Sequence, residues 1–291
     1  MRAAREPKLR SAANGRAMAL PLKPRQLLAL LAVALLGLNA CGGGEGDQAG
    51  SDSSGDERSA GSSESPLSGA LTVFAAASLT DVFSELGDAF MADNPAVDVT
   101  FNFGPSSGLA TQINQGAPAD VFASANSSQM TVVTQAGSAE GEPTIFTENV
   151  LQIAVPAGNP AGITGLSDFA NADLTLAICT PEVPCGAAAE TVFAAAGITP
   201  SVDSLEEDVR AALTKVELGE VDAALVYVTD VIAAGDKVEG IDFPETEEAV
   251  NSYPIVALTA APNPDTATAW VEFVLSDVGA AALEGAGFRT P

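Results

Sequence analysis

Two serines lie at turns where an apolar strand is followed by a helical pattern, and they are the first candidates for chemistry. Ser78 follows an apolar run that ends in three alanines, and Ser106 lies in the segment GPSSG at 104–108. A serine at a helix start offers a hydroxyl, and the N–H groups of the first turn have no acceptor within the helix. Such groups bind anions. The alternative for Ser78 taken alone is an ordinary helix cap.

Further segments of the same kind follow along the chain. GAPADVFASA at 116–125 leads into a strand that again ends in small residues, and CTPEVPCG at 179–186 is a proline-containing turn before a helix. EEDVRAA at 206–212 opens another helix, and Tyr227 ends a strand with a phenol. Hydroxyls and N–H groups donate hydrogen bonds, so the set suits a ligand that only accepts them.

The chain contains no histidine. This absence excludes Ser-His and Cys-His nucleophile pairs and most zinc sites. Paired carboxylates such as Glu206 and Asp208 suggest acid–base catalysis. In a chain with 38 acidic residues, however, such pairs occur by chance and usually form a solvated face.

Three cysteines are present, Cys41, Cys179 and Cys185. If Cys41 is used for lipid attachment, the remaining even pair in an exported protein favours a disulfide between Cys179 and Cys185. Such a bridge would shape the turn that contains Pro181 and Pro184. The alternatives are two free buried thiols, a redox pair, which the five intervening residues disfavour, and a metal site, which lacks further soft ligands.

The elements that must position these residues alternate between strand and helix from about residue 68. Strands are expected at 71–75, 97–103, 120–125, 150–156, 174–179 and 222–228, and helices at 79–92, 107–115, 127–137, 186–197, 206–218 and 228–235. This alternation predicts an α/β fold with parallel sheets covered by helices. Roughly 220 ordered residues favour two lobes.

The predicted division places lobe 1 at about 69–148 plus 256–291 and lobe 2 at about 149–255. Apolar segments at 149–155 and 252–258 are expected to cross between the lobes. The tail at 264–288 is expected to be helical, with Trp270 as a core anchor.

The N-terminal residues 1–40 have the pattern of a signal peptide. Basic residues precede an apolar run at 27–38 that is too short for a permanent membrane span, and the segment LNAC ends at Cys41 like a bacterial lipobox. Ordinary secretion with cleavage nearby is the alternative. Residues 41–68, rich in Gly, Ser and acidic side chains, are expected to form a lipid-anchored flexible tether. Residues 69–291 are then expected to fold alone as a monomer.

The charge of the chain limits its partners. Seven of the 12 basic and one of the 38 acidic residues lie in residues 1–40, so the mature chain keeps 5 and 37 and has a net charge of −32. Nothing in it could neutralise the phosphates of a nucleic acid. Because the overall field repels anions, an anion site must work through short-range hydrogen bonds.

Residues 69–291 resemble the molybdate-binding periplasmic proteins of ABC transporters, through AAASLT at 75–80 and GAPADVFASA at 116–125 in the same order and spacing. The resemblance implies a two-lobed, type 2 periplasmic-binding-protein fold with the ligand in the cleft between the lobes. It also implies a binding protein that is no enzyme and needs no cofactor.

The resemblance assigns the oxyanion donors position by position. They are the hydroxyls of Ser78, Ser106 and Tyr227 and the backbone N–H groups of Cys185 and Val209, and Ala125 could add another. They would hold molybdenum as its oxyanion and not as a bare cation. Cys185 stands where the family commonly has alanine, which leaves the backbone N–H in place.

The predicted function is therefore capture of molybdate, and also of tungstate, by a lipoprotein on the outer face of the cell membrane or on its periplasmic side. It would deliver the ion to an ABC permease and its ATPase. Molybdate is an acceptor-only dianion and matches neutral donors, whereas hydrogenphosphate would need an acceptor. The alternatives are another oxyanion such as sulfate, an enzyme that reuses the fold, or a structural surface lipoprotein. The hydroxyls are expected to face an open, wet cleft, and Arg210 to have no direct role.

Overall fold

The computed structural model describes residues 66–291. The predicted signal peptide, Cys41 and all but the last residues of the predicted tether lie outside the described residues. Within 66–291, no helix is long and apolar enough to span a bilayer.

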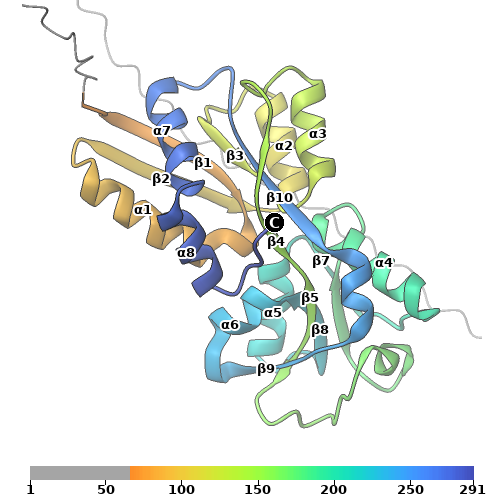
Figure 1. Cartoon of the computed structure of the whole chain (residues 1–291). Helices are drawn as coiled ribbons and strands as arrows, with labels where there is room; N and C mark the ends of the chain where they lie inside the picture. The colour runs from red at the N-terminus through yellow and green to blue at the C-terminus, as the bar shows by residue number, and fades with distance from the viewer. Residues whose placement is uncertain (1–65) are drawn as a thin grey trace, which may run out of the picture. The chain divides into compact units, whose positions relative to one another are not determined.

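The first sheet has five strands in the order β2-β1-β3-β10-β4 (Figure 1). Strands β2, β1 and β3 are parallel, whereas β10 is antiparallel to both of its neighbours. The strand bounds are β1 Gly69–Ala76, β2 Val97–Gly104, β3 Val121–Ala123, β4 Thr144–Asn149 and β10 Asn251–Ala257.

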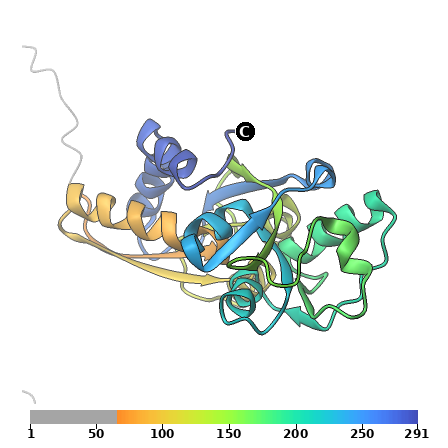
Figure 2. The same cartoon turned by 90° about the horizontal axis from the view of Figure 1, so that it is seen from below.

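Helices cover both faces of this sheet, and together they form lobe 1. Helices α1, α7 and α8 lie on one face and α2 and α3 on the other (Figure 1, Figure 2). In β1 the side chains alternate, so that Leu71 and Val73 pack on the first face and Phe74 on the second. The helical bounds are η1 Ala77–Leu79, α1 Thr80–Asp93, α2 Ser106–Asn114, α3 Ser127–Gln135, α7 Pro264–Val274 and α8 Asp277–Gly285.

Trp270 anchors the core of lobe 1, as predicted. Its side chain is fully buried, and the rings of Phe83 and Phe90 meet it edge-on with centroid distances of 5.7 and 5.4 Å. Edge-to-face aromatic pairs of this kind contribute beyond the area that they bury. The C-terminal helices are thereby fixed to α1 and to the sheet.

The second sheet has the order β7-β6-β8-β5-β9 and forms lobe 2 with its own helices. Here β7, β6 and β8 are parallel, and β5 is antiparallel to β8 and β9. The bounds are β5 Leu151–Pro156, η2 Leu166–Ala170, β6 Leu176–Cys179, α4 Pro184–Ala196, β7 Ser204–Glu206, α5 Val209–Glu217, β8 Ala223–Tyr227, α6 Val228–Ala234, η3 Gly235–Lys237, β9 Val238–Ile241 and η4 Pro244–Ala249. The predicted α/β fold with two sheets flanked by helices is confirmed.

The chain passes between the sheets at two adjacent points. Strand β4 ends at Asn149, which pairs with Asn251 at the start of β10, and β5 begins at Leu151, which pairs with Tyr227 of the second sheet. The segment predicted as one strand at 149–155 is thus divided near Val150. Because β10 pairs only with strands of the first sheet from Asn251 onward, we propose a lobe boundary near residue 250 in place of the predicted 255.

Two local predictions differ from the structure. The helix expected from residue 206 begins at Val209, because Ser204–Glu206 pairs with β6 as the short strand β7 and Asp208 caps the helix. Strands β4, β7 and β9 were not predicted. Two of them, β7 and β9, are only three and four residues long, so they carry too little alternation to be recognised.

Candidate functional site

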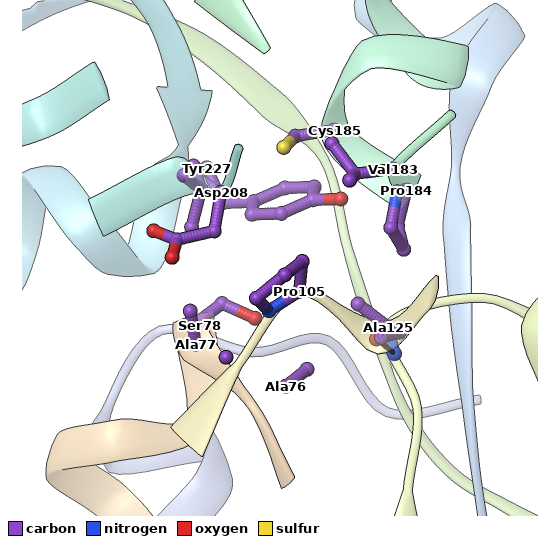
Figure 3. A pocket seen from close by; sticks show the side chains of 13 residues that line it. Ala76, Ala77, Ser78, Pro105, Ala125, Val183, Pro184, Cys185, Asp208 and Tyr227 are labelled. Atoms are coloured by element: carbon purple, nitrogen blue, oxygen red, sulfur yellow. Dashed lines mark hydrogen bonds between the residues drawn. The ribbon is translucent and has the colours of Figure 1, made fainter. Parts of the chain in front are cut away.

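A small pocket lies between the two lobes, and all six predicted site residues line it (Figure 3). It contains about 230 Å³ of space that no protein atom fills, open solvent included. The lining residues are Ala76, Ala77, Ser78, Gly104, Pro105, Ser106, Ala125, Val183, Pro184, Cys185, Asp208, Val209 and Tyr227.

Lobe 1 contributes the two serines, each directly after a parallel strand. Ser78 lies in η1 after β1, and Ser106 is the first residue of α2 after β2. The Ser106 Oγ accepts a hydrogen bond of 3.0 Å from the N–H of Ala125. Ala125 therefore lines the pocket, but its N–H already donates to Ser106. This contact disfavours the expectation that the Ala125 N–H donates directly to a ligand.

Lobe 2 contributes two helix N-termini. Cys185 is the second residue of α4 and Val209 is the first residue of α5. N–H groups in these positions have no acceptor within their own helix, so they are free to donate to a group in the pocket. The carboxylate of Asp208 accepts from the N–H of Ala211, which fixes the start of α5. In Figure 3 this carboxylate lies on the side away from the Tyr227 hydroxyl.

The Tyr227 hydroxyl is the least satisfied polar group of the pocket. Tyr227 ends β8 and is 1% exposed, and within residues 66–291 its hydroxyl has no hydrogen-bond partner. Burial raises the pKa of Tyr227 well above its ordinary value, so the phenol stays protonated. A buried donor without an acceptor is costly, and a bound anion would supply the acceptor.

The expectation of an open, wet cleft is wrong for this structure. Ser78, Ser106 and Tyr227 are 5%, 1% and 1% exposed, because the two lobes close over the pocket. The hydroxyls of the two serines also have partners within the protein, which the sequence did not indicate. Removal of these two hydroxyls should therefore change the stability of the ligand-free protein.

The predicted disulfide between Cys179 and Cys185 is present, with a Cα–Cα distance of 5.7 Å. It joins the end of β6 to the first turn of α4 and so closes the turn that presents the Cys185 N–H to the pocket. Gly186 allows this turn to pack closely, since a Cβ at this position would overlap the carbonyl oxygen of Thr180.

Replacement of both cysteines by serine is expected to lower the free energy of unfolding by roughly 2 kcal/mol, because the small ring no longer restricts the unfolded chain. Urea unfolding of the wild type and the double variant measures this difference. Intact mass should show that reduction adds two hydrogens to the native protein. Two alkylatable thiols in the native, unreduced protein would contradict the bridge.

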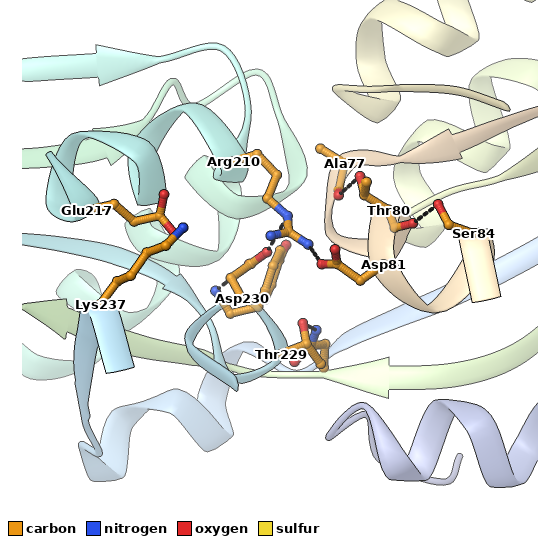
Figure 4. Close-up of polar contacts among 11 residues, drawn as sticks. Ala77, Thr80, Asp81, Ser84, Arg210, Glu217, Thr229, Asp230 and Lys237 are labelled. Atoms are coloured by element: carbon orange, nitrogen blue, oxygen red, sulfur yellow. Dashed lines mark hydrogen bonds and ion pairs between the residues drawn. The ribbon is translucent and has the colours of Figure 1, made fainter. Parts of the chain in front are cut away.

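An ion-pair cluster connects the lobes beside the pocket (Figure 4). Arg210 in α5 of lobe 2 contacts the carboxylate of Asp81 in α1 of lobe 1, and its Nε lies 3.2 Å from Oδ1 of Asp230. Asp230 is fully buried, and its Oδ2 accepts from the N–H of Tyr227. Arg210 does not line the pocket, but it ties the Tyr227 region of lobe 2 to lobe 1.

Asp230 gives this cluster a pH dependence. Burial raises the pKa of Asp230 to about 7, against the opposing effects of Arg210 and the Tyr227 N–H. The folded state therefore holds a proton that the unfolded chain releases near pH 4, and stability falls as the pH rises through this interval.

Thermal unfolding is expected to show that the wild type loses stability relative to Asp230→Asn between about pH 5 and pH 7. The amide keeps an oxygen acceptor for the Tyr227 N–H but does not titrate. Asp236→Asn, at an exposed position, is the matched control and should parallel the wild type. A constant difference between wild type and Asp230→Asn across this interval would show that Asp230 does not take up a proton there.

The sequence did not identify Tyr253 as part of the site region, nor the contacts that Arg210 makes across the lobes. Tyr253 reads as an ordinary interior residue of a strand, which its position in β10 matches. Asp208 is the N-cap of α5, and nothing in the type or spacing of Arg210 indicated its contact with Asp81 in lobe 1.

Comparison with known proteins identifies similar chains. Residues 71–289 match the family described as "Bacterial extracellular solute-binding protein". The "Molybdate-binding protein ModA" of Mycobacterium tuberculosis (strain ATCC 25618 / H37Rv) is 42% identical over 228 residues, covering 78% of this chain and 87% of the relative. The protein of the same name from Escherichia coli (strain K12) is 32% identical over 231 residues, covering 76% and 89%. The solved periplasmic molybdate-binding protein of Azotobacter vinelandii superposes with a TM-score of 0.66 at 19% identity, covering 76% of this chain and 99% of that one, and supports the fold.

Proposed function

The chain belongs to the bacterial extracellular solute-binding protein family, and we infer that it is the molybdate-binding substrate protein of an ABC importer. It is not an enzyme. Its task is to capture the anion outside the cell and to present it to a membrane permease, which an ATPase drives.

The hydroxyl of Tyr227, which has no partner in the part of the chain that the structure describes, is the observation that carries the choice of ligand class. It lines the same small pocket as the hydroxyls of Ser78 and Ser106 and the helix-start N–H groups of Cys185 and Val209. Five donors around one cavity suit a tetrahedral dianion whose four oxygens only accept. Each charge-assisted hydrogen bond in such a cavity contributes about 1.5–3 kcal/mol.

A site made of neutral donors is also compatible with the strongly negative net charge of the chain. The mature protein is strongly acidic, so it repels an anion at long range, and salt screens that repulsion beyond about 10 Å. At contact, the donors act over a few ångströms in a site from which water is largely excluded. The protein therefore needs no cationic side chain in the pocket, and none of the described residues that line it is cationic.

Other tetrahedral oxyanions are the remaining candidates. Tungstate has nearly the same size and chemistry as molybdate, and we propose that the pocket accepts it as well. Sulfate is smaller, so the size of the pocket decides between it and molybdate. The carboxylates that suggested catalysis have structural partners instead, since Glu206 pairs with Lys215 and Asp208 caps α5.

Isothermal titration calorimetry with the purified protein tests this function. Molybdate and tungstate should bind with similar affinity at a stoichiometry of one, and sulfate and phosphate much more weakly. Tight sulfate binding without molybdate binding would reassign the ligand. An absence of binding by all four anions would contradict the proposal as a whole.

We further propose that Cys41 is acylated and that residues 41–68 tether the binding domain to the outer face of the cell membrane or its periplasmic side. Cells that express the wild type should incorporate labelled palmitate into this protein, whereas the Cys41→Ser variant should remain unlabelled. Equal labelling of both would exclude Cys41 as the attachment site.

A further inference from the structure

A second buried tyrosine lies behind the oxyanion pocket. Tyr253 in β10 of lobe 1 is fully buried, and its hydroxyl oxygen is 2.9 Å from Oγ of Ser78. The ring is held by Phe288 and Phe146, whose centroids lie 5.5 and 6.4 Å away in edge-on arrangements. Tyr253 does not itself line the pocket.

The direction of the bond between Tyr253 and Ser78 follows from the ligand. Each hydroxyl has one hydrogen to donate and can also accept. A ligand that only accepts needs the hydrogen of Ser78, so this hydrogen is not available for Tyr253. The hydrogen between the two oxygens must then come from the phenol, and burial favours the protonated phenol at Tyr253.

Ser106 shows the same arrangement independently. Its Oγ accepts from the N–H of Ala125, which can only donate, so the hydrogen of Ser106 is free for the pocket. The carbonyl of Ala125 in turn accepts from Nδ2 of Asn251, two residues before Tyr253 in β10. In both cases, therefore, a group of lobe 1 forms a hydrogen bond with the serine oxygen.

We propose that Tyr253 is a positioning residue of the oxyanion site, whose O–H donates to Ser78 and commits the serine hydrogen to the ligand. This inference rests on the proposed function. Since Ser78 and Tyr253 both belong to lobe 1, the pair is set before the lobes close. A hydroxyl that already accepts from the protein is also a stronger donor, because hydrogen bonds in a chain polarise one another.

The arrangement also bears on selectivity. The Ser78 oxygen has two lone pairs, and the bond from Tyr253 uses one of them, so the serine is a weaker acceptor for a protonated ligand such as hydrogenphosphate. Without the phenol of Tyr253, Ser78 is free to turn and accept. Tyr253→Phe should therefore weaken molybdate binding but not phosphate binding, which loss of packing alone would not produce.

A double-mutant cycle tests the inference by calorimetry on the wild type, Tyr253→Phe, Ser78→Ala and the combined variant. Tyr253→Phe is expected to weaken molybdate binding about tenfold, in line with one hydrogen bond to an anion. In the Ser78→Ala background the same change should have no further effect, because no serine hydroxyl is left to position. The molybdate-to-phosphate affinity ratio should fall only when Ser78 is present.

The matched control is Thr246→Val, which removes a buried hydroxyl that bonds to the Leu151 carbonyl outside the pocket. It should lower the melting temperature without changing the molybdate affinity. If Tyr253→Phe does not fold, Tyr253→Met replaces it, because methionine fills the space flexibly and has no hydroxyl.

Equal losses of affinity in the two backgrounds, or an unchanged affinity of Tyr253→Phe, would overturn the positioning role while the proposed function stands. A wild type that binds none of the oxyanions would overturn the proposed function, and this inference with it. The two failures are therefore distinguished by the wild-type titration alone.

Discussion

Ser78→Ala, Ser106→Ala and Tyr227→Phe are each expected to weaken molybdate binding by about 1.5–3 kcal/mol, or roughly tenfold to a hundredfold. Each change removes one hydroxyl donor from a cavity in which the residues concerned are at most 5% exposed. Water cannot readily replace the lost donor there, so one oxygen of the dianion stays unpaired. Calorimetry of each variant measures the loss directly.

The ligand-free stabilities should separate the three variants. Ser78 and Ser106 have hydrogen-bond partners within lobe 1, so their removal should cost about 1 kcal/mol of stability. Tyr227 has no partner among the described residues, so Tyr227→Phe should leave the stability of the ligand-free protein unchanged or raise it. Weaker molybdate binding without a loss of stability is the result expected for a residue whose hydroxyl acts only on the ligand.

One pattern would contradict the neutral-donor mechanism. If all three hydroxyl variants bound molybdate like the wild type while Arg210→Ala abolished binding, a side-chain charge would hold the anion. The Arg210 contacts to Asp81 and Asp230 give no reason to expect this, since Arg210 does not line the pocket.

Arg210→Ala is expected to lower the free energy of unfolding by about 3 kcal/mol at pH 8, because it leaves the carboxylate of Asp230 buried without its cation. Asp230 is fully buried, and its pKa is already raised to about 7 by that burial. Near pH 6 the carboxyl takes up a proton and no longer needs a cation, so the cost should be smaller there. Chemical unfolding at the two pH values tests both statements.

The effect of Arg210→Ala on binding should remain smaller than that of the hydroxyl deletions. Arg210 joins the lobes through its contact with Asp81, whose side chain is 61% exposed. Exposed ion pairs of this kind contribute at most about 1 kcal/mol, which corresponds to roughly fivefold in affinity. Asp81→Ala removes this contact and leaves the pair with Asp230 intact. It should weaken binding to the same small extent without the loss of stability.

Lys237→Ala is the control for the loss of a cation in lobe 2. Lys237 pairs with Glu217, and its side chain is 67% exposed. Its removal should change stability by no more than about 0.5 kcal/mol at either pH and should leave molybdate binding unchanged. A loss as large as that of Arg210→Ala would point to a general effect of net charge instead of the buried pair.

Sequence patterns were sufficient to predict several features of this protein. Strand-to-helix turns with small residues identified Ser78 and Ser106, and the lack of histidine removed most catalytic alternatives. Cysteine parity predicted the bridge between Cys179 and Cys185, which the structure contains. The serine turns and the cysteine pair are recognisable because each depends on residues close together in the chain, where backbone geometry limits the possible arrangements.

Sequence patterns and the order of the motifs were therefore enough to predict the fold class, the family and six of the thirteen residues that line the pocket. The long-range contacts became visible with the folded structure: Tyr253 bonds to Ser78 across 175 positions of the chain, and Arg210 reaches Asp81 across 129. The folded structure also shows that the N–H of Ala125 donates to Oγ of Ser106. Such contacts join elements of separate strands and lobes, and a side chain's type does not reveal which distant group will meet it when the sheets form and the lobes close.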